Sequence, residues 1–296
     1  MPAPAYAPLE LRTDPAALAL ETTTVNDRGS TTVVRHPPTR TSTRATILLH
    51  GAAGSWTTWT PLIETADGSM PNVLVLDLPG WGDAVLAEGA TIDDVCELVR
   101  AAAEELGYTE WDVVGHSMGG FIALHMAALW PGNVLSVGLV SPTTWSVIES
   151  VAHPVRRFTT LPAFTMLWRV MRLMRSGGIV RFARRLGVLR LAVAPLFRHP
   201  LRVPRGVIDA LAREVRPAGF SAAAEMTRGY DADVVWARIH CPISAVRGDR
   251  DVFTLASDFD RLRSVQPDAR LTVIADCGHF ATVERPAEAL EALGFD

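Results

Sequence analysis

The sequence contains no lysine, so all 28 basic residues are arginine, and the formal net charge is −4. The complete replacement of lysine by arginine is typical of genome-wide codon bias. Arginine by itself is therefore weak evidence that the protein recognises a polyanion. The chain also lacks any recognised nucleic-acid-binding module. We therefore expect no nucleic-acid partner.

Cysteine is scarce as well. The three cysteines, Cys96, Cys241 and Cys277, are too few and too scattered for a disulfide framework or a zinc site. We expect neither a metal nor another cofactor.

Long apolar runs are also missing. The longest, around Phe121–Trp130, has about ten residues, whereas a membrane span needs about 20. The N-terminus lacks the basic stretch followed by an apolar one that marks a signal peptide. These absences predict a soluble, cytoplasmic protein without stable membrane insertion, and they leave its oligomeric state open.

The sequence does contain an alternation of short apolar strands and amphipathic helices. The expected strands are 45–49, 72–77, 111–115, 134–140, 242–248 and 270–275. The expected helices include 91–106, 121–130, 254–265 and 286–293. Such strands, joined by helical crossovers, form a mostly parallel, doubly wound sheet with helices on both faces. In front of them, 20–25 and 31–35 are predicted to form a hairpin around Asn26-Asp27-Arg28-Gly29.

The alternation stops between residues 143 and 232. This segment is helical in pattern, rich in proline, and holds fifteen arginines against five acidic residues, a charge of about +10. We therefore predict an α/β core in two parts, 1–142 and 233–296, with the helical segment 143–232 inserted between them.

The third apolar strand runs directly into Gly115-His116-Ser117-Met118-Gly119, and a helical pattern follows at once. This context is that of a nucleophile elbow, in which a serine sits on a strained turn between strand and helix. Glycines two residues before and after the serine remove the clashes of such a turn. The N–H of Met118 opens the helix, where a developing oxyanion is best stabilised.

A serine nucleophile needs a histidine base that is oriented by a carboxylate. Of eight histidines, His279 follows the last strand and precedes the last helix, at a sheet edge from which a loop can reach Ser117. Either Asp249 or Asp251, in the loop after the preceding strand, is a suitable carboxylate, and the residues alone do not separate them. The loop 51–53 has small side chains and is expected to supply a second oxyanion donor.

Taken together, these motifs resemble the α/β-hydrolase superfamily across roughly residues 20–296. The matching motifs are His50-Gly51-Ala52-Ala53-Gly54, Asp77-Leu78-Pro79-Gly80-Trp81-Gly82, Gly115–Gly120, Gly248-Asp249-Arg250-Asp251, Gly278-His279-Phe280 and Glu284-Arg285-Pro286. The resemblance implies that Asp251 is the acid, that Ala52 and Met118 form the oxyanion hole, and that the inserted segment is a cap. We further expect the substrate pocket to include His50, Trp81, Phe280 and Trp168.

One stretch of the insertion, 161–175, combines a wide apolar face around Trp168 with arginines at 169, 172 and 175. Three interpretations fit it: a lid whose apolar side roofs an acyl pocket, a helix resting on an anionic membrane surface, or a cap helix packed on the core with a solvated basic side.

The simplest reaction for this set of residues is ester hydrolysis. We predict a serine hydrolase that cleaves small to medium, largely apolar carboxylic esters through an acyl-enzyme intermediate. Serine at the elbow disfavours the epoxide hydrolases and haloalkane dehalogenases of the superfamily, which use aspartate there. A thioesterase, a lactonase, a carbon–carbon bond hydrolase and a non-hydrolytic, ligand-binding or cofactor-free relative remain alternatives. Carbon–carbon hydrolases of the family usually carry tryptophan where this chain has Phe280.

Overall fold

The structure is a computed structural model. It describes residues 5–52, 54–153, 161–173 and 189–295. Ala53 and Arg175, which were named above, lie outside these residues.

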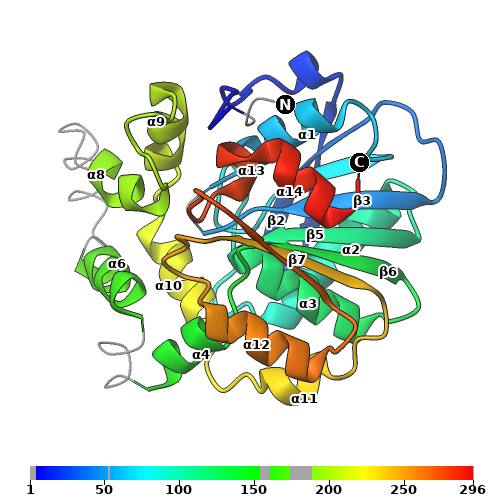
Figure 1. Cartoon of the computed structure of the whole chain (residues 1–296). Coiled ribbons are helices and arrows are strands. Elements are labelled where there is room, and N and C mark those ends of the chain that lie inside the picture. The colour runs from blue at the N-terminus through cyan, green and yellow to red at the C-terminus, as the bar shows by residue number, and fades with distance from the viewer. Residues whose placement is uncertain (1–4, 53, 154–160, 174–188, 296) are drawn as a thin grey trace.

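An eight-stranded sheet with the order β1-β2-β4-β3-β5-β6-β7-β8 forms the centre of the protein (Figure 1). The strands are β1 (Glu21–Asp27), β2 (Ser30–His36), β3 (Arg44–Leu49), β4 (Val73–Asp77), β5 (Glu110–His116), β6 (Val134–Val140), β7 (Ile243–Gly248) and β8 (Arg270–Ile274). β2 pairs antiparallel with β1 and β4, and all other pairs are parallel. The predicted mostly parallel α/β sheet is confirmed.

The predicted hairpin is present, with a tighter turn than expected. Asp27 pairs with Ser30, so only Arg28 and Gly29 remain in the loop. Their φ angles are 45° and 82°. Two successive residues with positive φ match the twist of the flanking strands, which explains why both strands continue into the predicted turn.

Helices cover both faces of the sheet. One face carries α1 (Thr60–Ala66), α13 (Ala281–Glu284) and α14 (Pro286–Leu293). The other carries α2 (Ile92–Glu105), α3 (Met118–Leu129), α11 (Ala232–Trp236) and α12 (Ala256–Val265). Short 3₁₀ turns occur at η1 (Pro15–Leu18), η2 (Trp56–Trp59) and η3 (Ala194–Leu196).

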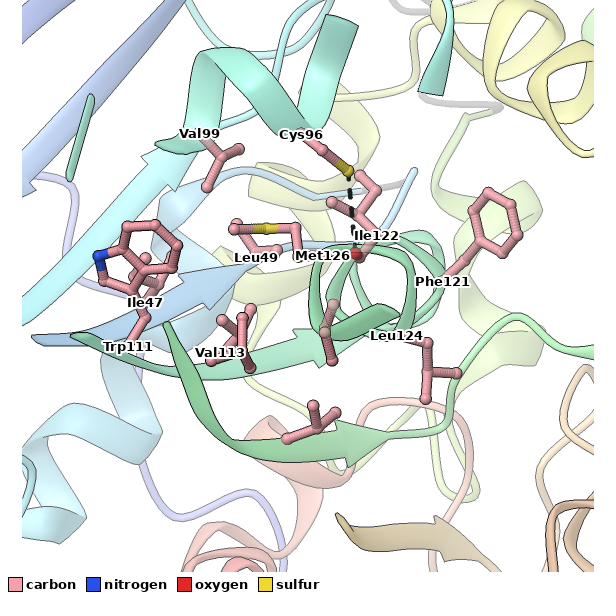
Figure 2. Packing of buried hydrophobic residues seen from close by; sticks show 14 of the residues in the cluster. Ile47, Leu49, Cys96, Val99, Trp111, Val113, Phe121, Ile122, Leu124 and Met126 are labelled. Atoms are coloured by element: carbon pink, nitrogen blue, oxygen red, sulfur yellow. Dashed lines mark hydrogen bonds between the residues drawn. The ribbon is translucent and has the colours of Figure 1, made fainter. Parts of the chain in front are cut away.

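The two faces explain why the central strands are uniformly apolar. In β3, Ile47 and Leu49 pack under α2 and α3, whereas Leu48 packs under α1 and α14. Side chains alternate along a strand, so a strand that is covered on both sides needs apolar residues at every position. Figure 2 shows the α2–α3 side of this packing around Trp111 and Val113 of β5.

Between β6 and β7, helices predominate among the described residues. The helices are α4 (Trp145–Ala152), α6 (Pro162–Leu173), α8 (Leu189–Val193), α9 (Arg205–Arg213) and α10 (Pro217–Met226). Figure 1 shows them together at one side of the sheet, with α10 nearest to the core. α11 packs against α3, so the chain has rejoined the core by residue 232.

Within the described residues, no helix is long and apolar enough to cross a membrane. The same part of the chain holds no group of three or more histidine, cysteine or acidic side chains arranged to bind a metal ion.

Candidate active site

Ser117 lies on a sharp turn between β5 and α3, with φ 52° and ψ −116°. A positive φ is uncommon for any residue with a side chain and stores conformational strain. The flanking glycines are required by close backbone contacts. A Cβ atom on Gly115 would lie 2.1 Å from the carbonyl oxygen of Gly119, and one on Gly119 would lie 2.0 Å from that of Leu49. The turn therefore lifts Ser117 out of the sheet at the start of α3.

His279 and Asp251 form a buried pair. The Nδ1 atom of His279 donates a hydrogen bond to Oδ1 of Asp251 over 2.9 Å. The same oxygen accepts hydrogen bonds from the backbone N–H groups of Phe253 and Thr254. With Nδ1 engaged as donor, the Nε2 atom of this tautomer is left as the acceptor.

Burial alone would raise the pKa of Asp251. The charge of His279, together with hydrogen bonds from His279 and the Phe253 backbone, outweighs this effect and holds the pKa of Asp251 below its ordinary value. Asp251 is therefore ionised at neutral pH.

The other aspartate of this loop is placed differently. Asp249 is exposed, and its Oδ1 atom accepts a hydrogen bond from the backbone N–H of Cys277. It braces the loop in front of His279, whereas Asp251 contacts the imidazole ring itself. The structure thus places Asp251, the aspartate that the resemblance implies, against the His279 ring and leaves Asp249 outside that contact.

His116 connects the serine turn to the histidine loop. Its Nε2 atom donates a hydrogen bond to the carbonyl oxygen of His279 over 3.0 Å, and the two rings lie 4.9 Å apart. Burial, followed by the nearby charge of His279, lowers the pKa of His116 to about 3. His116 is therefore a neutral brace next to Ser117.

The loop after β3 lies against the serine turn. A Cβ atom on Gly51 would be 2.9 Å from the Cβ atom of Ser117, so glycine permits this approach. The indole N–H of Trp81 donates to the carbonyl oxygen of Ala52 over 2.9 Å and fixes the loop. Ala52 and Met118 both border the same cavity as Ser117. Met118 is the first residue of α3, so its N–H has no acceptor within the helix.

The cavity beside Ser117 has a volume of about 520 Å³ and lies between the core and the inserted helices. Its walls include Phe164 of α6, Phe220 and Ala223 of α10, and Phe253. Apart from the hydroxyl groups of Ser117, Thr143 and Thr227, the side chains that line it are apolar. The ring of Phe253 also contacts His279, with 4.9 Å between centroids, so the histidine borders this region.

The four residues predicted to line the pocket are not among the residues that line this cavity. His50 is fully buried, with Nδ1 donating to the Gly51 carbonyl and Nε2 accepting from the Leu78 N–H. Trp81 braces Ala52 and lines a neighbouring chamber. Phe280 stacks on Phe197. His50 and Phe280 are therefore held away from this cavity by contacts within the surrounding loops, whereas Trp81 borders the adjoining chamber.

Trp168, the fourth, packs with Val151 and Leu161 within the insertion. One turn earlier on α6, Phe164 reaches the cavity instead. Arg169 and Arg172 are exposed, so the apolar side of α6 is packed inward and its basic side faces solvent. Sequence reasoning missed Phe253, although it lies two residues after Asp251, in a loop that has to reach the site.

Glu284 anchors the loop that carries His279. This fully buried carboxylate accepts hydrogen bonds from the backbone N–H groups of Gly278 and Phe280, on either side of the histidine. It also accepts hydrogen bonds from the Tyr6 hydroxyl and from the backbone N–H of Arg198 in the inserted segment. Burial raises the pKa of Glu284. One side chain thus ties the N-terminal segment, the insertion and the histidine loop together.

Replacing Glu284 by glutamine is expected to lower the free energy of unfolding by about 1–3 kcal/mol, because the new amide N–H₂ group faces one of the four donors. We expect kcat to fall about tenfold, since the histidine loop loses part of its anchor. Urea denaturation and steady-state kinetics measure both effects. Glu288→Gln, on a partly exposed residue of α14, is the matched control. Equal behaviour of the two variants would contradict the anchoring role.

Comparison with known proteins identifies the family. Residues 46–293, most of the chain, match the model of the Alpha/beta hydrolase family. This chain belongs to that family. It is 26% identical over 266 residues to the "Putative carbamate hydrolase RutD" of Escherichia coli O81 (strain ED1a), covering 84% of this chain and 90% of the relative.

A second relative of this alpha/beta hydrolase is the 2-hydroxy-6-oxononadienedioate/2-hydroxy-6-oxononatrienedioate hydrolase of Burkholderia vietnamiensis (strain G4 / LMG 22486). It is 26% identical over 269 residues, covering 88% of this chain and 89% of the relative. Among solved structures, a thermophilic esterase from Thermogutta terrifontis has a TM-score of 0.70 at 20% identity, covering 92% and 96% of the two chains. The relatives support a hydrolase, and the solved structure supports the fold.

Proposed function

We propose that this alpha/beta hydrolase cleaves small to medium, largely apolar carboxylic esters through an acyl-enzyme intermediate. Ser117 attacks the ester carbonyl while His279 accepts its proton and then donates it to the departing alcohol. Asp251 orients His279 and stabilises its charged form, and the backbone N–H groups of Ala52 and Met118 bind the oxyanion. Water then attacks the acyl-enzyme with His279 again as base, and Ser117 is restored. The insertion 143–232 acts as a cap over this site.

The observation that carries the proposal is the lining of the cavity beside Ser117. Phenylalanine, alanine and valine side chains dominate it, and no charged side chain is among the described residues that line it. Transfer of an apolar ester from water into such a site is favourable, because its apolar surface leaves water. Ser117, Met118 and Ala52 all border this cavity, which supports their proposed roles as the nucleophile and the two N–H donors.

The same lining weighs against the substrate named for the Burkholderia relative. A nonadienedioate carries two carboxylates, and burying a carboxylate without a cationic partner is costly. Phe280 also stands where carbon–carbon hydrolases of the family usually carry tryptophan. A carbamate, the substrate class named for the other relative, is kept as a comparison substrate. Thioesters and lactones use the same machinery.

The test is hydrolysis of p-nitrophenyl esters from acetate to dodecanoate by the purified protein. We expect serine-dependent turnover of these esters, and kcat/KM for the preferred ester at least about tenfold above that for a matched aryl carbamate. Thioester, lactone and ring-cleavage dienoate substrates are assayed in parallel. Turnover confined to the dienoate or the carbamate, or none from the folded protein, would contradict the proposal.

A further inference from the structure

A second, wholly apolar chamber adjoins the cavity beside Ser117. It has a volume of about 350 Å³ and is lined by the loop after β4, the first turns of α2 and α3, and α10. The eleven described residues that line it all have apolar side chains, among them Leu78, Trp81, Val95 and Met226. A chamber with this lining suits a hydrocarbon group and offers no partner for a charged one.

The chamber and the Ser117 cavity share three wall residues, Met118, Phe121 and Ala223. Met118 directly follows the serine, so the junction begins beside the nucleophile. Figure 2 shows Phe121 at one side of α3, pointing away from the packed side chains of Ile47 and Val99. Phe121 thus separates the interior of the core from the junction.

On its outer side, the chamber meets a surface groove along residues 86–92 and α10. The chamber and the groove share Leu86, Ile92 and Met226, and the groove also includes the exposed Glu88. Three spaces therefore follow one another between core and insertion: the Ser117 cavity, the chamber and the groove.

Small residues of α10 border this row of spaces, which we call the passage. A Cβ atom on Gly219 would lie 3.2 Å from the Gly80 carbonyl oxygen and from the Trp81 ring, so α10 rests directly on the loop after β4. Further along the helix, Ala223 leaves space where a larger side chain would fill the junction. The passage accepts a slender chain more readily than a branched or aromatic group.

We propose that the chamber is the site of a linear acyl chain, so that the preferred substrates are esters of unbranched medium-chain carboxylic acids. This inference rests on the proposed ester hydrolysis at Ser117. The acyl group stays bonded to Ser117 in the acyl-enzyme, and its chain then runs past Met118 and Ala223 toward Met226. Each methylene that enters the chamber raises kcat/KM about fourfold, until the chain reaches the groove and further carbons gain little.

The test compares acyl-chain selectivity, expressed as kcat/KM for the octanoate ester relative to the acetate ester. Met226→Trp fills the outer end of the chamber and is expected to lower this ratio at least about tenfold. Met226→Ala enlarges the chamber and is expected to move the preferred chain length upward by about one or two carbons. Ser221→Phe is the control. It adds a ring to the same helix at a different groove, between α10 and α6, and should keep the wild-type ratio. An unchanged ratio in both Met226 variants would overturn the proposal.

A second measurement separates this inference from the proposed reaction. Calorimetry with uncharged linear primary amides of two to twelve carbons measures binding to the Ser117→Ala variant without turnover. We expect affinity to rise with chain length and to lose this dependence when Met226→Trp is added. If no ester is hydrolysed but this pattern holds, the proposed reaction fails and the chain site stands. Flat affinities alongside active ester hydrolysis would leave the reaction standing and remove the chain site.

Discussion

Replacing Ser117 by alanine is expected to lower kcat for ester hydrolysis by about five to six orders of magnitude. The hydroxyl removed is the one at the strained turn beside Ala52 and Met118, where the proposed mechanism forms the acyl-enzyme. Binding and oxyanion stabilisation survive, so a small rate above the uncatalysed reaction remains. Steady-state kinetics and labelling by a fluorophosphonate, located by mass spectrometry, measure the loss.

The fold is expected to survive this change. Alanine occupies the same positive φ at a similar cost, and no backbone contact of the turn is removed, so the melting temperature should stay within a few degrees. Ser244→Ala, at a buried serine of strand β7 in the same sheet, is the matched control and should retain activity. Substantial turnover by a folded Ser117→Ala protein, or labelling at another residue, would contradict the assignment of the nucleophile.

Replacing Asp251 by asparagine is expected to lower kcat by about three to four orders of magnitude. Oδ1 of Asp251 accepts hydrogen bonds from the His279 ring and from two backbone N–H groups, so the asparagine oxygen is held at that position. The geometry therefore survives, but the negative charge that stabilises protonated His279 is lost. The pKa of Asp251 lies below its ordinary value, which shows that the folded protein favours its charged form.

Asp249→Asn is the control for this prediction, two residues earlier in the same loop. Its amide oxygen can still accept the hydrogen bond from Cys277, and Asp249 is exposed, so kcat should change less than about threefold. Side-by-side kinetics of the two variants decide the question. Equal losses of kcat in the two variants would contradict the assignment of Asp251 as the residue that orients His279.

The layout of the fold could be predicted from local pattern. Short uninterrupted apolar runs such as 45–49 and 134–140 became parallel strands, because a strand covered on both faces cannot alternate apolar with polar residues. The starts of helices could also be predicted from a few neighbouring residues. Thr91 caps α2 through a reciprocal hydrogen-bonding arrangement with Asp94. Gly115 and Gly119 indicated the tight turn around Ser117, because only glycine tolerates the backbone contacts found there.

Other features of the site had no local signal. His50 and Phe280 lie in motifs near Ser117, yet hydrogen bonds and ring contacts hold them away from the Ser117 cavity, and Trp81 lines the adjoining chamber instead. Nearness of a motif to the nucleophile does not tell which way its side chains point. The cavity walls come instead from α6, α10 and the loop after Asp251.

Local sequence patterns were enough to predict the order of strands and helices along the chain, the turn that carries Ser117 and the loop that carries His279. Each of these depends on residues a few positions apart, through alternation along a strand, helix capping or the freedom of glycine. The tertiary structure alone shows that Glu284 anchors the histidine loop and that Ala223 borders two apolar spaces, and it places Asp251, the aspartate implied by the resemblance, against His279. Those contacts join segments far apart in the chain, and packing of the insertion against the core, rather than local pattern, brings them together.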